Sequence, residues 1–137
     1  MGRILAIDYG SKRVGLAVTD PLRIIASGLT AIHSKDLIVF LENYFKKEVV
    51  DVIVVGEPKT MMNQKSDSAR FIDPFVKHLQ NKFPDKKIER YDERFTSTMA
   101  HQTMLSGGLK KKDRRDKEKV DVISAIIILQ DYLQFSQ

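Results

Sequence analysis

The distribution of hydrophobic and polar residues predicts three strands near the N-terminus. Gly2–Tyr9 contains the continuous apolar run Ile4–Ile7, which is typical of a central strand buried on both faces. In Arg13–Thr19, larger aliphatic residues alternate with smaller ones. A short glycine-containing turn separates the two segments, so we expect them to form a hairpin. A third strand is expected within Ala26–His33.

Helical and strand patterns alternate in the rest of the chain. Apolar residues at helical spacing predict four helices, over Lys35–Glu48, Ser68–Phe83, Thr96–Ser106 and Lys119–Phe135. Short apolar runs predict two more strands, at Asp51–Gly56 and Lys87–Tyr91. Pro74 falls inside the second predicted helix. Either this helix kinks there, or Asp73 caps a new helix with Pro74 at its first position.

The order of these elements predicts the fold class. Three consecutive strands, followed by helix, strand, helix, strand and two helices, imply an α/β fold with a mixed five-stranded sheet and helices on both faces. A doubly wound nucleotide-binding fold would need a helix after the first strand, where this chain has a second strand. We therefore expect a ribonuclease H-like topology, formed by residues 1–137 as a single domain.

Two acidic residues lie at the ends of predicted strands. Asp8 ends the first apolar strand, where an isolated charge is costly unless it is paired or binds a metal. The alternative for Asp8 is a turn-capping aspartate before a glycine. Glu93 lies just past the carboxyl end of another strand, where sites of open α/β sheets gather. Its alternative is a surface ion pair with Arg94.

A third acid, Asp121, interrupts the most apolar helix of the chain. Stabilisation by the helix dipole is one explanation for its position. The other is metal binding, since Ser124 and Ala125 on the same helix face are small enough to leave room for a metal or a sugar–phosphate backbone. Three carboxylates suit Mg²⁺ or Mn²⁺. These ions can activate a water molecule to hydrolyse a phosphodiester, so that the enzyme needs no covalent nucleophile.

Composition narrows the function classes. The chain contains no cysteine, which excludes disulfides, thiolate metal sites and cysteine catalysis. No apolar run approaches the roughly 20 residues of a membrane span, and the N-terminus lacks a signal-peptide pattern. We therefore expect a cytoplasmic protein with no membrane partner. The histidines show no metal-ligand spacing, and only His101 is kept as a candidate neighbour of the site.

Positive charge is concentrated in one segment. The formal net charge is +5, and residues 110–119 contribute seven bases against three acids. The seven bases are Lys110, Lys111, Lys112, Arg114, Arg115, Lys117 and Lys119. Such a cluster can bind a polyanion. The other interpretation is a solvated loop without a binding function. The acidic centre favours the first interpretation.

Four motifs give the chain a resemblance to a known family. Leu5–Asp20, which reads LAIDYGSKRVGLAVTD, closely resembles the opening motif of the YqgF family. Val54–Pro58, Asp92–Ser97 and Val120–Ala125 resemble its later motifs in the same order, so that the similarity spans nearly the whole chain. Members are described as nucleases of pre-16S ribosomal RNA, and an older name for them is Holliday-junction-resolvase-like proteins.

The resemblance implies a specific site and substrate. It implies metal-dependent hydrolysis of RNA, with Asp8, Glu93 and Asp121 as catalytic residues and as ligands of Mg²⁺ or Mn²⁺. It also implies a bacterial cytoplasmic role in ribosome biogenesis, with the 5′ end of pre-16S ribosomal RNA as substrate and the ribosomal subunit as its setting. The bases expected to contact nucleic acid are Lys12, Arg13, Arg94, Lys110, Lys111, Lys112, Arg114 and Arg115.

The chain departs from the family pattern after Gly56. Glu57 stands where leucine is common, and the following loop lacks a glycine–threonine pair. Glu57 is therefore a candidate fourth acid, although an ion pair with Lys59 is the simpler interpretation.

Three rival functions fit part of the pattern, and chain length excludes the third. The first is a resolvase of four-way DNA junctions, which would act as a dimer on structured DNA, whereas we expect a monomer or weak dimer. The second is a non-catalytic RNA-binding assembly factor. The third, a phosphotransferase of the sugar-kinase type, needs two such domains, which 137 residues cannot supply.

Overall fold

A five-stranded sheet in the order β3-β2-β1-β4-β5 forms the centre of the computed structural model. The structure describes residues 2–9, 12–57, 69–92 and 117–135. The strands are β1 Arg3–Tyr9, β2 Arg13–Thr19, β3 Ala26–His33, β4 Val50–Glu57 and β5 Lys87–Asp92. Strand β1 pairs antiparallel with β2 and parallel with β4, while β2–β3 is antiparallel and β4–β5 is parallel. The predicted mixed five-stranded sheet is confirmed.

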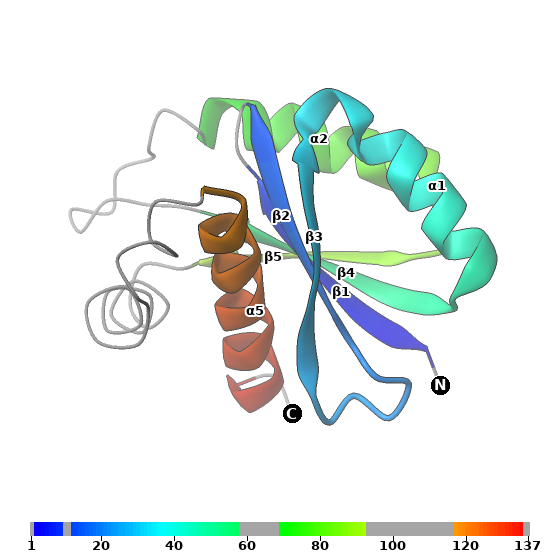
Figure 1. The fold of residues 1–137 in the computed structure, drawn as a ribbon. Helices are drawn as coiled ribbons and strands as arrows, with labels where there is room; N and C mark the ends of the chain where they lie inside the picture. The colour runs from blue at the N-terminus through cyan, green and yellow to red at the C-terminus, as the bar shows by residue number, and fades with distance from the viewer. Residues whose placement is uncertain (1, 10–11, 58–68, 93–116, 136–137) are drawn as a thin grey trace.

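Helices cover both faces of this sheet (Figure 1). They are α1 Leu37–Lys47, α2 Ala69–Lys82 and α5 Lys117–Phe135. Helices α1 and α2 pack on one face, and α5 crosses the other, where it contacts β1, β2 and β3.

Residues of β1 alternate between two apolar clusters, one on each face of the sheet. Leu5 and Ile7 belong to the cluster on the α1 and α2 side. Ile4 and Ala6 belong to the cluster that includes Ile128 and other residues of α5. Because both faces are covered, every one of these β1 positions must be apolar, which explains the continuous hydrophobic run. The same alternation turns the next even position, Asp8, toward α5.

The second helix runs through its proline. Helix α2 is continuous from Ala69 to Lys82 with Pro74 inside it, so no separate helix begins at Asp73. A proline inside a helix removes one backbone hydrogen bond and costs about 3 kcal/mol. Burial of Ile72 and Leu79 on the inner side of α2 offsets that cost.

The helix predicted at Lys35–Glu48 is divided into two parts. A 3₁₀ turn over Ser34–Asp36 precedes α1, and the His33 side chain accepts a hydrogen bond from the backbone N–H of Lys35 (3.1 Å). The helix predicted at Thr96–Ser106, with His101, lies outside the described residues. In the described part of the chain, no helix is long and apolar enough to cross a membrane.

Candidate carboxylate site

Asp8 lies near the end of β1, between two glycines of the neighbouring strands. It is paired with Gly15 on β2 and with Gly56 on β4. Since neither glycine has a side chain, the two positions paired with Asp8 place no side chain beside it on the α5 face of the sheet. At Gly15, the backbone of α5 takes this space.

Gly15 also lets α5 approach the sheet closely. A Cβ atom at this position would overlap with the backbone carbonyl of Asp121. Only glycine fits there without moving α5 away from β2. The close approach brings Asp121, in the second turn of α5, to the carboxylate of Asp8, although the two residues are far apart in sequence.

The surroundings of Asp8 disfavour its negative charge. Burial raises its pKa from 3.8 to about 7, and the charge of Asp121 contributes to the rise, while a hydrogen bond from the Ser124 side chain acts in the opposite direction. Ser124 itself is 5% exposed and lies one helical turn beyond Asp121. Two carboxylates that repel each other in a partly buried setting attract a cation. A positive charge beside the two carboxylates relieves this repulsion.

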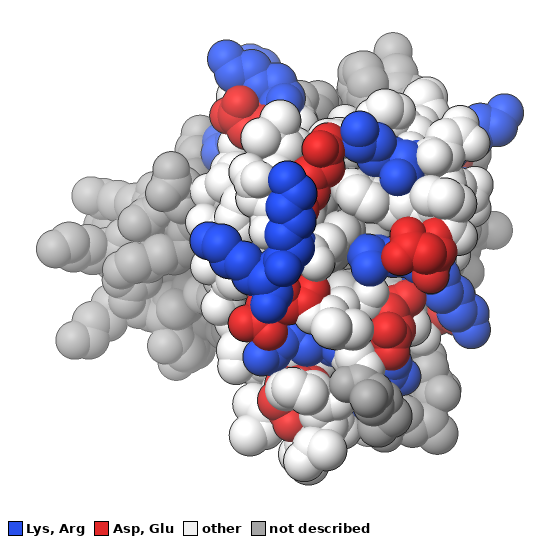
Figure 2. Space-filling model, turned by 90° about the vertical axis from the view of Figure 1, so that its right-hand side faces the viewer, with Lys and Arg blue, Asp and Glu red and all other residues white. Residues whose placement is uncertain are grey.

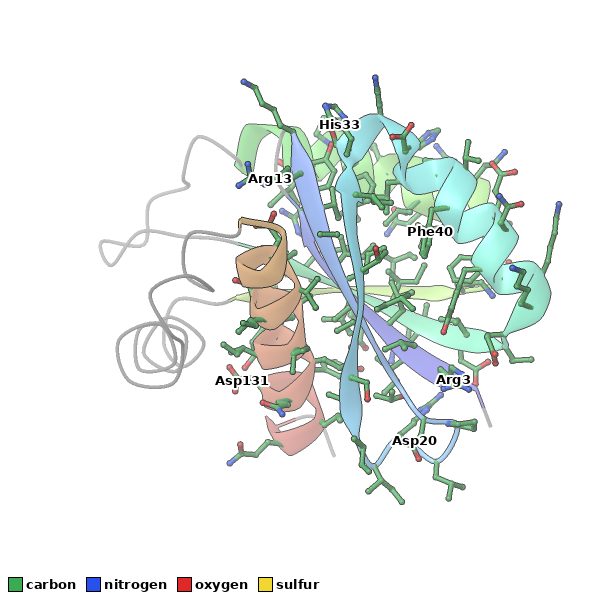
Figure 3. The ribbon with its side chains drawn as sticks, viewed as in Figure 1. Arg3, Arg13, Asp20, His33, Phe40 and Asp131 are labelled. Atoms are coloured by element: carbon green, nitrogen blue, oxygen red, sulfur yellow. The ribbon has the colours of Figure 1, made fainter. Side chains whose placement is uncertain are left out.

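Arg13, at the start of β2, already provides one positive charge. Its Nε donates a hydrogen bond to Oδ2 of Asp121 at 2.8 Å. The Arg13 side chain is 46% exposed and that of Asp121 is 19% exposed. Figure 3 shows Arg13 beside the first turns of α5, at the opposite end of the sheet from Asp20. Lys12, just before it, is exposed.

Other predicted site residues lie outside the described part of the chain. Glu93 follows Asp92, the last residue of β5, and is one of them. The same holds for the predicted nucleic-acid contacts Arg94, Lys110, Lys111, Lys112, Arg114 and Arg115. Glu57 is the last residue of β4, and its side chain is also outside the description. The described residues bring together the pair Asp8 and Asp121, and among them no group of three or more acids, histidines or cysteines forms a metal cluster.

Two features of this site were not recognised from the sequence. The first is the pair of glycines beside Asp8. Closing the β1–β2 hairpin through its short turn would have paired Asp8 with Gly15, so part of the signal was present. The second is the hydrogen bond from Ser124 to Asp8, because the sequence indicated only that Ser124 shares a helix face with Asp121. This hydrogen bond depends on how α5 crosses the sheet.

The face of the molecule that carries α1 bears both positive and negative side chains (Figure 2). Figure 2, which views the α1 side, shows Lys and Arg interspersed with Asp and Glu. Described ion pairs of the protein include Arg3 with Glu48 and Lys82 with Glu42. Such a mixed surface is typical of solvated protein rather than of a nucleic-acid interface.

Comparison with known proteins identifies the relatives of this chain. A family model described as "RuvX: Holliday junction resolvase" matches residues 2–135. A protein of Flavobacterium johnsoniae is 59% identical over 133 residues, which cover 97% of this chain and 96% of the relative. A protein of Phocaeicola vulgatus is 59% identical over 134 residues, covering 98% and 96%. Both relatives are named "Putative pre-16S rRNA nuclease".

A solved structure supports the fold. The structure "T. thermophilus RuvC in complex with Holliday junction substrate" matches with a TM-score of 0.60 at 14% identity, covering 98% of this chain and 96% of that one. This likeness confirms the predicted ribonuclease H-like fold. The nearly full-length family match and the 59% identical relatives show that the chain belongs to the RuvX family, which the sequence motifs indicated under the name YqgF.

Proposed function

We propose that this chain is a metal-dependent nuclease that processes the 5′ end of pre-16S ribosomal RNA in the cytoplasm. The observation that carries the proposal is the pair Asp8 and Asp121, which β1 and α5 bring together beside two glycines. A carboxylate pair of this kind has no structural value by itself, because mutual repulsion and burial make it costly. Two relatives at 59% identity carry the name of a pre-16S rRNA nuclease, which supports the substrate.

The donor atoms suit a divalent cation. Carboxylate oxygens are the ligands that Mg²⁺ and Mn²⁺ prefer, and Asp8 and Asp121 supply them from two different elements. Glu93 is proposed as the third ligand. Strand β5, which ends one residue before Glu93 in the sequence, directs Glu89 and Tyr91 toward α5. Once bound, such a cation activates a water molecule and stabilises charge on the scissile phosphate.

The residues of the chain have separate tasks in this proposal. Asp8 must lose its proton before it can bind a cation, and its pKa of about 7 makes binding tighter as pH rises through neutrality. Ser124 orients Asp8 through its hydrogen bond. The bases of the segment 110–119, together with Lys12, would hold the substrate backbone without reading its sequence.

A four-way DNA junction is the second candidate substrate. The description of the family model as a Holliday junction resolvase favours it. A resolvase must place two active sites on one junction and therefore acts as a dimer, whereas processing of one RNA strand needs a single site. The state of the protein in solution and the choice of substrate together separate the two functions.

Parallel cleavage assays test the proposal. Precursor 16S ribosomal RNA and a four-way DNA junction would each be incubated with the protein in Mg²⁺, Mn²⁺ or EDTA. We expect cleavage of the RNA with metal and none with chelator. The variants D8N, E93Q and D121N should be inactive but folded, and E42Q, which changes a half-exposed acid of α1, serves as the matched control. Junction cleavage without RNA cleavage would favour the resolvase, and RNA binding without cleavage would favour an assembly factor.

A further inference from the structure

The ion pair between Arg13 and Asp121 is the contact that the proposed function leaves unexplained. Its 2.8 Å length shows a direct hydrogen bond, and the oxygen involved, Oδ2, belongs to a proposed metal ligand. Among the described ion pairs, it is the one that involves either acid of the site. A guanidinium and a divalent cation would compete for the same carboxylate.

We propose that Arg13 is a resident counter-cation of Asp121, displaced when a divalent metal binds, and that its freed guanidinium then contacts a substrate phosphate. This inference rests on the proposed function. It assigns to one residue two successive anionic partners, a carboxylate before metal binding and a phosphate after it. Metal binding and substrate binding would thereby be coupled through Arg13.

The exposure of the pair supports displacement. Almost half of the Arg13 side chain is exposed, so water can replace the lost contact. Exposed ion pairs shift an equilibrium by no more than about fivefold, and a divalent cation attracted by two carboxylates overcomes that easily. Asp121 is less exposed, and it stays at the site when Arg13 leaves. The pair is therefore weak enough to open and strong enough to compensate one negative charge in the metal-free protein.

The chemistry of arginine supports the second partner. A guanidinium presents several N–H donors in a planar fork, which matches phosphate oxygens as well as it matches a carboxylate. Arg13 lies at the start of β2, where its backbone is fixed by pairing with His33 of β3. A fixed backbone and an exposed side chain allow the head group to move by rotation of the side chain alone.

The alternative is a permanent clamp. In that case, Arg13 would hold α5 against β2 in every state of the protein, and its loss would loosen Asp121 and weaken metal binding. The two ideas therefore predict opposite effects of removing the guanidinium. Lys12 offers a matched control, since K12Q removes the same charge from the adjacent exposed position without removing the counter-cation of Asp121.

Metal binding without substrate gives the first test. Mn²⁺ would be titrated into the full-length protein at low ionic strength, with free Mn²⁺ followed by electron paramagnetic resonance. We expect R13Q to bind Mn²⁺ about two- to fivefold more tightly than the wild type, and K12Q to show a smaller gain in affinity. The difference between R13Q and the wild type should shrink in 0.5 M KCl, because charges are screened within about 5 Å at this concentration. Equal or weaker binding by R13Q than by K12Q would overturn the proposal.

Controls separate this inference from the proposed function. If the wild type does not bind Mn²⁺, or if D121N binds it as well as the wild type, the metal site itself is wrong and the inference fails with it. If the wild type binds Mn²⁺ and D121N does not, the site stands, and R13Q decides the inference alone. R13A, which also removes the counter-cation of Asp121, provides a second variant in case R13Q folds poorly.

Substrate binding gives the second test. The affinity for a structured RNA would be measured in Ca²⁺, which occupies oxygen sites, and in EDTA. R13Q should weaken RNA binding severalfold in Ca²⁺ but leave it unchanged in EDTA, because Arg13 is then still engaged by Asp121 in the wild type. Loss of the same size in both buffers would contradict the proposed exchange of partners.

Discussion

Replacement of Asp8 by asparagine should make the metal-free protein more stable while removing its function. Asparagine is similar in shape to aspartate but cannot ionise. In the fold, burial and the nearby charge of Asp121 raise the pKa of Asp8 from 3.8 to about 7. An acid whose folded pKa lies above its unfolded value destabilises the fold once it ionises. The destabilisation is absent well below the unfolded pKa of 3.8, grows between about pH 4 and 7, and is constant above that range.

The size of this effect follows from the pKa difference. A difference of about 3 pKa units corresponds to about 4 kcal/mol at most, since each unit contributes about 1.4 kcal/mol. Because Asp8 is partly exposed, solvent screens its repulsion from Asp121, and the destabilisation is smaller than this maximum. We expect D8N to gain about 1–3 kcal/mol in free energy of unfolding above pH 7, and nearly nothing at pH 4.

Urea unfolding in EDTA at pH 4, 5.5, 7 and 8 measures this gain. D20N is a control of opposite sign, because backbone N–H groups of Ile25 and Ile24 bind Asp20 and lower its pKa. A lowered pKa stabilises the fold above the unfolded pKa, so D20N should lose stability at neutral pH. A D8N gain that is the same at every pH, or a D8N protein less stable than the wild type at pH 8, would show that ionisation of Asp8 does not destabilise the fold.

Three further predictions concern other parts of the site. G15A should lower the free energy of unfolding by about 1–3 kcal/mol and reduce cleavage, because the added Cβ overlaps with the Asp121 backbone; unchanged stability in thermal unfolding would contradict the close approach. S124A should raise the pKa of Asp8 further by removing its hydrogen bond. Carboxyl ¹³C NMR would show this shift, and an unchanged titration would exclude the bond. Charge reversal of Lys110, Lys111 and Lys112 should weaken RNA binding more at low than at high salt, and a salt-independent loss would indicate a folding defect.

The elements could be predicted from local sequence, since strands and helices follow local periodicity. Strand β2 has the predicted bounds, and β3 fills the whole segment within which a strand was expected. Strands β1, β4 and β5 differ from the prediction by one residue at one or both ends. The sequence allowed either one helix through Pro74 or a new helix beginning there. The structure has one helix, which buries apolar neighbours of Pro74. The choice between the two depends on tertiary packing, which periodicity does not contain.

The site was less predictable than the fold. Each acid had an alternative when considered alone, and the family resemblance supplied their grouping. Asp8 meets Asp121 only because α5 crosses β2 at Gly15, and a long-range approach of that kind leaves no local signal. Arg13 was predicted to contact phosphate, whereas the structure pairs it with Asp121. Its contact with phosphate remains a prediction, as do the roles of Glu93 and of the basic segment.

The proposed function requires that Asp8 and Asp121 bind the metal ion with which the protein cleaves RNA. The most direct measurement is cleavage of precursor 16S ribosomal RNA by the wild type and by D121N, side by side in Mn²⁺ and in EDTA, with folding verified by circular dichroism. We expect cleavage by the wild type in Mn²⁺ but not in EDTA, and none by D121N in either buffer. Cleavage by D121N at the wild-type rate, or wild-type cleavage that persists in EDTA, would contradict it.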